Sequence, residues 1–325
     1  MAPRSSAAYA TSAWLAEVAL HRLEGIRIAV PDPVAQADFY AAAGFALDGA
    51  RLSTPDGGDQ LELTDGDFRR LLAVRLGAAE EADLSVIGSR LTALGVAHRT
   101  DGGVLRATDP VTRVEFEVRV TEKLVQSPAT EFAFNAPGRV HRHNERADGA
   151  HPRPRTPRRL GHIVIGTPDI DATKRFLVEG LGFRVSDETP GIIAFLRCST
   201  DHHNVALVGS EVAHLQHYSW ECDDVDHVGH TGTKLLRRDP SAVTWGFGRH
   251  FVGSNFFWYL PDPSGSFCEF YSDMDVIDDD IAWETTGRSP VAPELIGHSW
   301  GPAMPVEFIV PPDLDALRAG WARIG

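Results

Sequence analysis

An internal repeat constrains the fold of this chain more than any other feature of its sequence. The segment Leu23–Asp32 aligns without gaps on Leu160–Asp169, and both combine alternating apolar residues with a closing Pro-Asp pair. Each segment leads into an amphipathic stretch that ends in Gly-Phe, at Gly44-Phe45 and Gly182-Phe183. Repetition on this scale indicates that the fold is built from duplicated structural units.

Each repeat predicts a strand, a turn, a helix and further strands. The first copy gives a strand over 26–30 and a helix over 35–43, and the second gives a strand over 163–165 and a helix over 171–179. Two more such units begin with strands near 71–76 and 217–222, and their helices lie near 84–94 and 226–236. One helix on a few curved strands cannot bury its apolar face alone, so we expect the units to pair.

The predicted fold class is therefore α+β, with two domains. Each domain consists of paired βαβββ units that form an open, strongly curved barrel. A length of 325 residues also favours two domains over one. Pro, Gly, Arg and His crowd the stretch 128–159, which we interpret as a linker. The predicted boundaries are an N-terminal extension 1–20, a metal-free barrel domain 21–125, a basic linker 126–159, a catalytic metal-binding barrel domain 160–280 and a tail 281–325.

The net charge limits the classes of partner. Lys plus Arg number 31 against 45 Asp plus Glu, so the net charge of −14 repels nucleic acids and anionic membranes. No apolar run is long enough to span a bilayer, and Thr11, Ser12 and Glu17 interrupt the first residues before the core of a signal peptide forms. We expect a cytoplasmic protein that binds small molecules.

Three polar residues in the second half have no polar counterpart in the first. His162 aligns with Gly25 and Glu269 with Phe116, and His217 opens a predicted strand. The three are 55 and 52 residues apart, about one structural unit each, so equivalent strands are expected to bring them together. Two imidazoles and one carboxylate form the facial set that holds non-haem Fe(II) and leaves open positions. A cation would also remove the cost of burying an unpaired Glu269.

Further polar residues have spacings that suit the same cavity. His202 and His203 precede the predicted strand 204–208, and Tyr259 follows His250 by nine residues. Tyr259 and Glu269 flank the turn 261–265, which places them on neighbouring antiparallel strands. We expect these side chains to face one cavity.

Several segments together are similar to one known family. The sequence resembles the type I extradiol, catechol 2,3-dioxygenase-like ring-cleavage dioxygenases of the vicinal oxygen chelate superfamily, which share a glyoxalase-like fold. The resemblance covers residues 21–280, and in the first half it holds only in outline. The segments that carry it are Leu160–Ile163, Asp201–Leu207, His217-Tyr218, Gly248–His250 and the stretch from Asn255 through Tyr259 to Glu269–Tyr271.

The resemblance implies roles for the candidate residues. His162, His217 and Glu269 would bind iron, and His203 would act as an acid–base residue beside it. We prefer His203 over His202 because its 14-residue interval to His217 resembles that of the family, although a shift of one residue would exchange them.

The remaining implied roles concern the substrate. His250 and Tyr259 would bind the catecholate. Asn255 matches a recurring residue of the family without an assigned chemical step.

The implied reaction is the cleavage of a catechol-type ring beside its two adjacent hydroxyls, to a muconic semialdehyde type product. It would use Fe(II), with Mn(II) as an alternative, and O2 as the second substrate. We expect a homo-oligomer that binds neither nucleic acid nor membrane. Two alternatives remain open: a non-redox metal-dependent enzyme on the same fold, either a glyoxalase-like isomerase or a thiol transferase, and a binding or resistance protein for aromatic ligands. Consumption of O2 distinguishes the dioxygenase from both.

Overall fold

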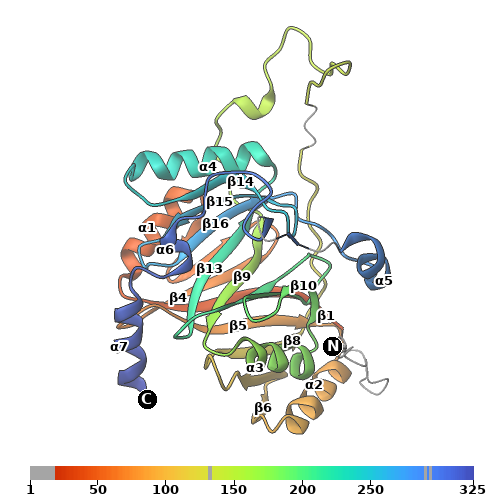
Figure 1. Cartoon of the computed structure of the whole chain (residues 1–325), viewed down its shortest axis with the longest axis vertical. Coiled ribbons are helices and arrows are strands. Elements are labelled where there is room, and N and C mark those ends of the chain that lie inside the picture. The colour runs from red at the N-terminus through yellow and green to blue at the C-terminus, as the bar shows by residue number, and fades with distance from the viewer. Residues whose placement is uncertain (1–18, 131–133, 289–290, 293–294) are drawn as a thin grey trace, which may run out of the picture.

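The chain folds around two eight-stranded mixed sheets that have the same strand order (Figure 1). The computed structural model describes residues 19–130, 134–288, 291–292 and 295–325. In the first sheet the order is β2-β3-β4-β1-β5-β8-β7-β6, and in the second it is β10-β11-β12-β9-β13-β16-β15-β14. Two βαβββ units meet at the centre of each sheet, through β1 and β5 in the first and through β9 and β13 in the second.

The first sheet and its two helices occupy residues 20–120. Their bounds are β1 Leu20–Val30, α1 Pro33–Ala43, β2 Ala46–Asp48, β3 Arg51–Thr54, β4 Gly58–Asp65, β5 Arg70–Ala78, α2 Glu81–Ala93, β6 His98–Asp101, β7 Val104–Thr108 and β8 Glu115–Val120.

The second sheet repeats this arrangement after a short 3-10 turn at Asp148–Ala150. Its elements are β9 Arg159–Thr167, α3 Ile170–Arg175, the π-helical turn Phe176–Leu181, β10 Arg184–Thr189, β11 Ile193–Arg197, β12 Val205–Gly209, β13 His214–Glu221, α4 Val225–Arg238, β14 Trp245–Arg249, β15 Phe256–Pro261 and β16 Phe267–Ser272.

The repeated Pro-Asp and Gly-Phe pairs mark the ends of the first helix in each half. The Asp32 carboxylate accepts two backbone N–H bonds at the start of α1, and the Asp169 carboxylate accepts one at the start of α3. Gly44 and Gly182 end these helical segments with φ values of 105° and 93°, in the left-handed region that glycine adopts without strain. The second segment differs from the expected single helix, because its last turn is π-helical.

The two sheets share a continuous apolar core. A buried polar cluster joins them where α1 lies near α4 and β13: the Tyr40 hydroxyl donates to that of Tyr218 at 2.9 Å, and the Tyr218 hydroxyl donates to Asp262 at 2.7 Å. Gln36 Nε2 also donates to Asp262, at 3.0 Å. Every member of the cluster is buried, so it fixes one barrel against the other.

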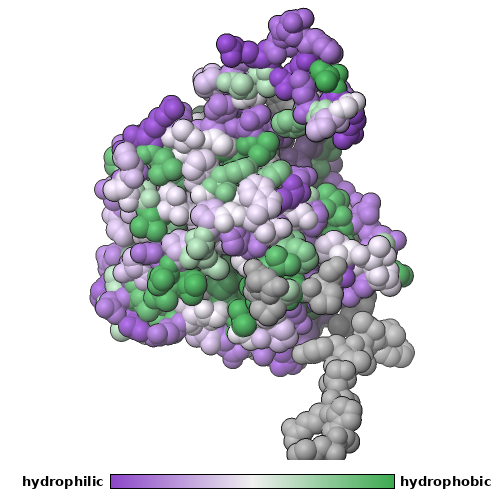
Figure 2. Space-filling view, turned by 45° about the horizontal axis from the view of Figure 1, so that its top comes forward, coloured by the Kyte–Doolittle hydropathy of each residue, from purple (hydrophilic) through white to green (hydrophobic). Residues whose placement is uncertain are grey.

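The segment between β8 and β9 projects from the body of the molecule (Figure 1). On the face seen in Figure 2, hydrophilic residues gather on this projection. Its C-terminal end is anchored by ion pairs from Arg155 to Asp224 at 2.6 Å and from Arg158 to Asp56 at 2.9 Å. We propose that this segment connects two domains, whose boundaries are those predicted from the sequence. The predicted N-terminal extension lies outside the described residues, apart from Ala19 and Leu20.

The C-terminal tail crosses the second sheet and returns to the first (Figure 1). Its elements are α5 Asp280–Ala282, the π-helical turn Trp283–Gly287, α6 Val306–Ile309 and α7 Leu314–Ile324. Asp313 pairs with Arg69 through two bonds of 2.8 and 2.9 Å, and Trp321 donates to the Ala213 carbonyl at 2.7 Å. These contacts hold α7 against both halves. None of the helices in the described part of the chain has the length and apolarity that a membrane crossing requires.

Candidate metal centre

The three candidate metal ligands lie on adjacent strands of the second sheet. In the ladder His162 on β9 faces Ser219 on β13, Ser219 faces Glu269 on β16, and Glu269 faces Tyr259 on β15. Residues directly opposite each other in a sheet point to the same face, as do residues two apart on one strand. His217 therefore shares the face of Ser219. It is an internal residue of β13, whereas the sequence places it at the start of a strand.

The ligand atoms of these residues converge. Nε2 of His162 lies 2.8 Å from Oε2 of Glu269, and Nε2 of His217 lies 3.7 Å from the same oxygen. One ligand atom from each of the three residues lies within 4.8 Å of the other two. All three residues are buried. Ligands bound at right angles about 2.1 Å from one ion would be roughly 3 Å apart.

Two of these atoms lack the partner that a buried polar atom requires. Among the described residues Nε2 of His217 is buried without a hydrogen bond, and Oε2 of Glu269 makes none of good geometry although His162 Nε2 lies 2.8 Å away. An unsatisfied carboxylate oxygen next to an unsatisfied imidazole nitrogen is costly, and a divalent cation would satisfy both. The donor set therefore fits a metal ion.

Neighbouring amides orient two of the ligands. Nδ1 of His217 contacts Oε1 of Gln216, and Asn255 Nδ2 donates to Oε1 of Glu269 at 3.1 Å. His217 thus directs its Nε2, and Glu269 its Oε2, to the centre. Asn255 carried no assigned chemical step, and nothing in the sequence pointed to Gln216, because neighbours along a strand normally face opposite sides. A register shift between Leu215 and His217 brings Gln216 within reach.

The electrostatics of the centre favour the protonation states that bind metal. Burial lowers the pKa of His217 to about 3, which keeps the imidazole neutral near pH 7. Burial would raise the pKa of Glu269, but the neighbouring His162 and His217 lower it to about 2. Neutral imidazole and ionised carboxylate are the forms that coordinate a cation.

His250 and Tyr259 form a pair beside the centre. Nδ1 of His250 lies 2.7 Å from the Gly297 carbonyl oxygen, and its Nε2 lies 2.9 Å from the Tyr259 hydroxyl. Burial lowers the pKa of His250 to about 4, and burial together with Glu269 raises the pKa of Tyr259 well above its usual range. A neutral His250 donates from Nδ1 to the carbonyl, so its Nε2 accepts the Tyr259 proton.

The two adjacent histidines have different surroundings. His203 lines the cavity, and its ring centroid is 4.2 Å from that of His162. Burial, followed by nearby histidines, lowers the pKa of His203 well below its usual value. His202 is fully buried away from the cavity and bonds to Asp187 at 2.9 Å. Only His203 can meet a ligand there.

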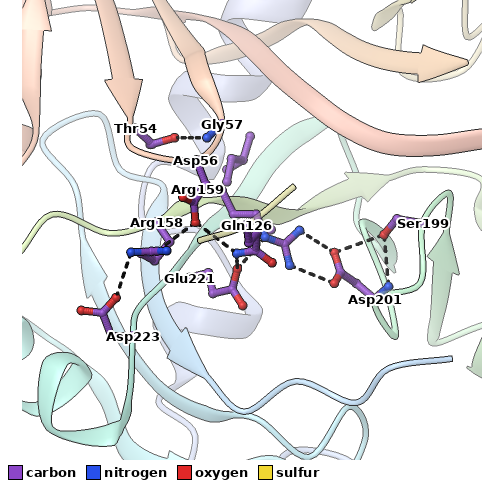
Figure 3. Close-up of polar contacts among 12 residues, drawn as sticks. Thr54, Asp56, Gly57, Gln126, Arg158, Arg159, Ser199, Asp201, Glu221 and Asp223 are labelled. Carbon is purple, nitrogen blue, oxygen red and sulfur yellow. Dashed lines mark hydrogen bonds and ion pairs between the residues drawn. The ribbon is translucent and has the colours of Figure 1, made fainter. Parts of the chain in front are cut away.

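A buried ion pair supports the turn that carries both histidines. Figure 3 shows the Arg159 guanidinium directed at the Asp201 carboxylate, with bonds of 2.7 and 2.9 Å. Asp201 also accepts from Ser199 Oγ and Asn204 Nδ2, each at 3.1 Å. Burial would raise the pKa of Asp201, but Arg159 lowers it overall. The turn is therefore tied to the start of β9, three residues before His162.

The cavity beside the centre has a volume of about 290 Å³ and is mostly apolar. Of the described residues that line it, none is Asp, Glu, Lys or Arg. The tail after Trp283, for which the sequence left a cover of the cavity and an interface as alternatives, supplies part of this lining. The apolar residues of the wall include Val164, Ile193, Phe195, Val208 and Trp245 from the strands of the sheet, Ile192 and Val252 from its loops, and Ile296, Met304, Phe308 and Ile309 from the tail.

The structure brings all six predicted site residues to one cavity or its wall. His162, His217, His203, His250 and Tyr259 line the cavity, and Glu269 lies behind them within reach of both candidate ligands. Their roles in binding and catalysis remain predictions.

Comparisons with known proteins agree with this architecture. Residues 159–270 match the model of the Glyoxalase/Bleomycin resistance protein/Dioxygenase superfamily. Metapyrocatechase 2 of Cupriavidus necator is 38% identical over 47% of this chain and 47% of its own length, so the match spans about half of that relative. The iron-dependent extradiol dioxygenase of Rhodococcus jostii is 25% identical over 75% of this chain and 83% of its own.

A solved structure extends the likeness to nearly the whole chain. The Mn(II)-bound glyoxalase from Novosphingobium aromaticivorans superposes with a TM-score of 0.68 at 22% identity, and covers 89% of this chain and 94% of its own. This likeness concerns the fold, and it confirms the predicted two-domain architecture. Residues 159–270 carry the match to the superfamily model, and extradiol dioxygenases are among the proteins to which the chain is similar.

Proposed function

We propose that the protein is an extradiol dioxygenase that uses non-haem Fe(II) and O2 to cleave the ring of a catechol-type aromatic to a muconic semialdehyde type product. One observation carries the proposal: the donor atoms of His162, His217 and Glu269 converge on the wall of an uncharged cavity that three further proton-transferring side chains face. His162, His217 and Glu269 would hold the iron. The chemistry that bound iron supplies is a set of adjacent open positions and a path for electrons between two substrates.

Tyr259 and His250 are assigned to the hydroxyls of the substrate. The Tyr259 hydroxyl lies between His250 Nε2, at 2.9 Å, and the ligand Glu269 that faces it across the ladder. A catechol hydroxyl beside Tyr259 can donate to the phenolic oxygen, while the phenolic proton passes to the neutral His250. This pair would hold the substrate in its deprotonated form.

His203 is assigned to acid–base work from another part of the wall. Its ring lies against His162, so it is close to any group held by the three ligands. Removing it should leave those ligands in place while slowing turnover, because acid–base groups act on the transition state.

The preferred substrate carries an uncharged, apolar substituent. The cavity presents aliphatic and aromatic side chains and no cationic group among its described lining residues. A substituent carboxylate would lose its hydration without gaining an ion pair, which is costly in an apolar site. Alkyl- or aryl-substituted catechols are therefore expected to bind better than carboxylated ones.

The iron assignment over Mn(II) is supported by the name of the iron-dependent relative in Rhodococcus jostii. The net charge of −14 supports a partner set limited to small molecules, without nucleic acid or membrane. A cytoplasmic location and a homo-oligomer are also part of this proposal. Sedimentation analysis of the purified protein tests the oligomer.

An oxygen electrode tests the proposed function. Protein purified anaerobically and loaded with Fe(II) should consume O2 with catechol and 3-methylcatechol and form a yellow product. The same protein with 3,4-dihydroxybenzoate should show a much higher KM. Loading with Mn(II) or Zn(II) in parallel identifies the active metal. Stoichiometric catechol binding without O2 uptake under every metal would instead favour a binding protein.

A further inference from the structure

A second histidine and a carboxylate form a buried chain behind His203. Nδ1 of His202 lies 3.0 Å from Nδ1 of His203, and Nε2 of His202 lies 2.9 Å from Oδ2 of Asp187. All three residues are buried. The chain therefore leads from Asp187 on β10 through His202 to a ring that lines the cavity.

A strand irregularity places Asp187 in this chain. Consecutive residues of a strand normally face opposite sides, but Ser186 and Asp187 are both buried. The pairing of β10 with β11 shifts register between Val185 and Asp187, as at a bulge. Bulges re-aim side chains in this way and recur beside functional sites.

The donors and acceptors of the chain have one consistent arrangement when both rings are neutral. An ionised carboxylate only accepts, so His202 must donate from Nε2 to Asp187. A neutral His202 then has a lone pair on Nδ1, which can only accept, and His203 must donate to it from its own Nδ1. This leaves Nε2 of His203 as an acceptor on the side available to the cavity.

We propose that His202 and Asp187 are positioning residues that fix the ring orientation and the tautomer of His203, so that its Nε2 meets the substrate as a proton acceptor. A proton taken from a substrate hydroxyl would bond to Nε2, while Nδ1 keeps its own proton and its bond to His202. The same proton returns to the substrate side later in turnover. The catalytic part of this inference rests on the proposed function, whereas the tautomer does not.

The C-terminal tail holds Asp187, at the end of this hydrogen-bonded series that lies away from the cavity. Arg288 Nε donates to Oδ1 of Asp187 at 3.2 Å, which leaves Oδ2 for His202. The Trp283 ring packs edge-on against His202 with centroids 5.4 Å apart, and its Nε1 donates to the Ser186 carbonyl at 3.0 Å. Such support is typical of a side chain whose orientation matters rather than of a histidine that merely fills a core.

Asp187→Asn tests the tautomer directly. The amide can turn its N–H₂ group to His202, so that Nε2 accepts and Nδ1 donates to His203, which then carries its proton on Nε2. An exchange of this kind imposes the wrong tautomer while leaving the shape of the site intact. In the full chain loaded with diamagnetic Zn(II) and labelled with ¹⁵N-histidine, the protonated nitrogen of His203 should change from Nδ1 to Nε2.

Kinetics of the Fe(II)-loaded variant provide the second readout. We expect kcat to fall about a hundredfold, with metal content and KM for 3-methylcatechol little changed. Arg288→Gln is the matched control: it removes the same ion pair but leaves Asp187 as an acceptor, so the tautomer and most of kcat should persist. His202→Phe removes the hydrogen-bonded link between Asp187 and His203 altogether. This variant should also lose kcat while it retains its metal.

The outcomes are separable. A His203 that is protonated on Nε2 in the unsubstituted protein, or that keeps the same tautomer in Asp187→Asn, would overturn the inference. A folded Asp187→Asn variant with undiminished kcat would also overturn its catalytic part. If no catechol is cleaved by the unsubstituted protein, the proposed function fails, yet the NMR measurement still decides the tautomer.

Discussion

The Nε2 atom of His250 lies 2.9 Å from the Tyr259 hydroxyl, while its Nδ1 lies 2.7 Å from the carbonyl of Gly297 in the C-terminal tail. The tail thus sets which nitrogen of His250 accepts the phenolic proton. Tyr259 in turn faces the candidate ligand Glu269 across the ladder between β15 and β16. A proton acceptor and a candidate metal ligand therefore lie at one side of the proposed substrate site.

Tyr259→Phe should lower kcat about a hundredfold and leave the metal bound, because the phenolic oxygen takes part in proton transfer and lies outside the donor set. Steady-state kinetics and metal analysis of the purified variant measure this. Tyr218→Phe is the control, since it removes another buried hydroxyl, at the contact between the two sheets. Equal losses of kcat in the two variants would argue for a general packing effect and against the role of Tyr259.

His162→Ala should lose most of its bound iron, because it removes one of three convergent donors. His227→Ala, which removes a buried histidine from α4, should keep it. Plasma emission spectroscopy after anaerobic loading and desalting gives the metal content of both. Iron occupancy in His162→Ala equal to that of the unsubstituted protein would rule out His162 as a ligand.

The repeat in the sequence was sufficient to predict the duplicated sheets, because Pro-Asp and Gly-Phe pairs fix helix ends through local hydrogen bonds and backbone conformation. The approach of His162 and His217 follows from the same repeat, since β9 and β13 are the first strands of their units and pair at the centre of the second sheet. Glu269 departs from the expected set of equivalent strands, because β16 is the last strand of its unit and reaches the centre by pairing with β13. The duplicated sheets and the approach of the two histidines depend on local and periodic signals, which a single sequence carries.

Features that depend on irregular strands were not predicted, and those that depend on docking of the tail could not be assigned to particular residues. Gln216 and Asp187 reach the site only through register shifts in β13 and β10, and no alternation of residues signals these. Phe308 and Gly297 reach it because the tail folds back over the cavity. That docking involves Asp313 and Arg69, residues 244 positions apart.

Phe308→Ala should raise KM for 3-methylcatechol about tenfold with a smaller effect on kcat. The Phe308 ring packs against Tyr259 and Trp245, each with a centroid distance of 4.7 Å, and closes one side of the apolar cavity. The loss of about 1.4 kcal/mol of apolar contact corresponds to a tenfold change in binding. Val306→Ala changes an exposed residue of the same helix and should leave KM unchanged.

A KM ratio near one between Phe308→Ala and Val306→Ala would show that the tail does not contact the substrate. A fall in thermal stability without a change in KM would limit Phe308 to a structural role.

Asp201→Asn should destabilise the protein by about 3 kcal/mol at pH 7, because it leaves Arg159 without its buried bidentate partner. The pKa of Asp201 is lower in the folded than in the unfolded protein. Its contribution is therefore complete above the unfolded pKa of about 3.9 and is lost as the pH falls through the folded value.

Urea denaturation at a series of pH values measures this difference. The free energies of unfolding of the unsubstituted protein and of Asp201→Asn should approach each other only below about pH 4. Asp315→Asn, which changes an exposed carboxylate of α7, should have little effect at any pH. A difference in the free energy of unfolding that stays constant down to the most acidic pH at which the protein folds would contradict the assigned direction of the Asp201 pKa.

The stoichiometry of O2 uptake by Fe(II)-loaded protein during turnover of 3-methylcatechol tests the central claim most directly. We predict one O2 consumed for each catechol and a yellow product whose mass equals that of substrate plus both oxygen atoms, with no such activity in Glu269→Gln. Isomerisation or thiol addition without O2 uptake, or full activity in Glu269→Gln, would contradict the account.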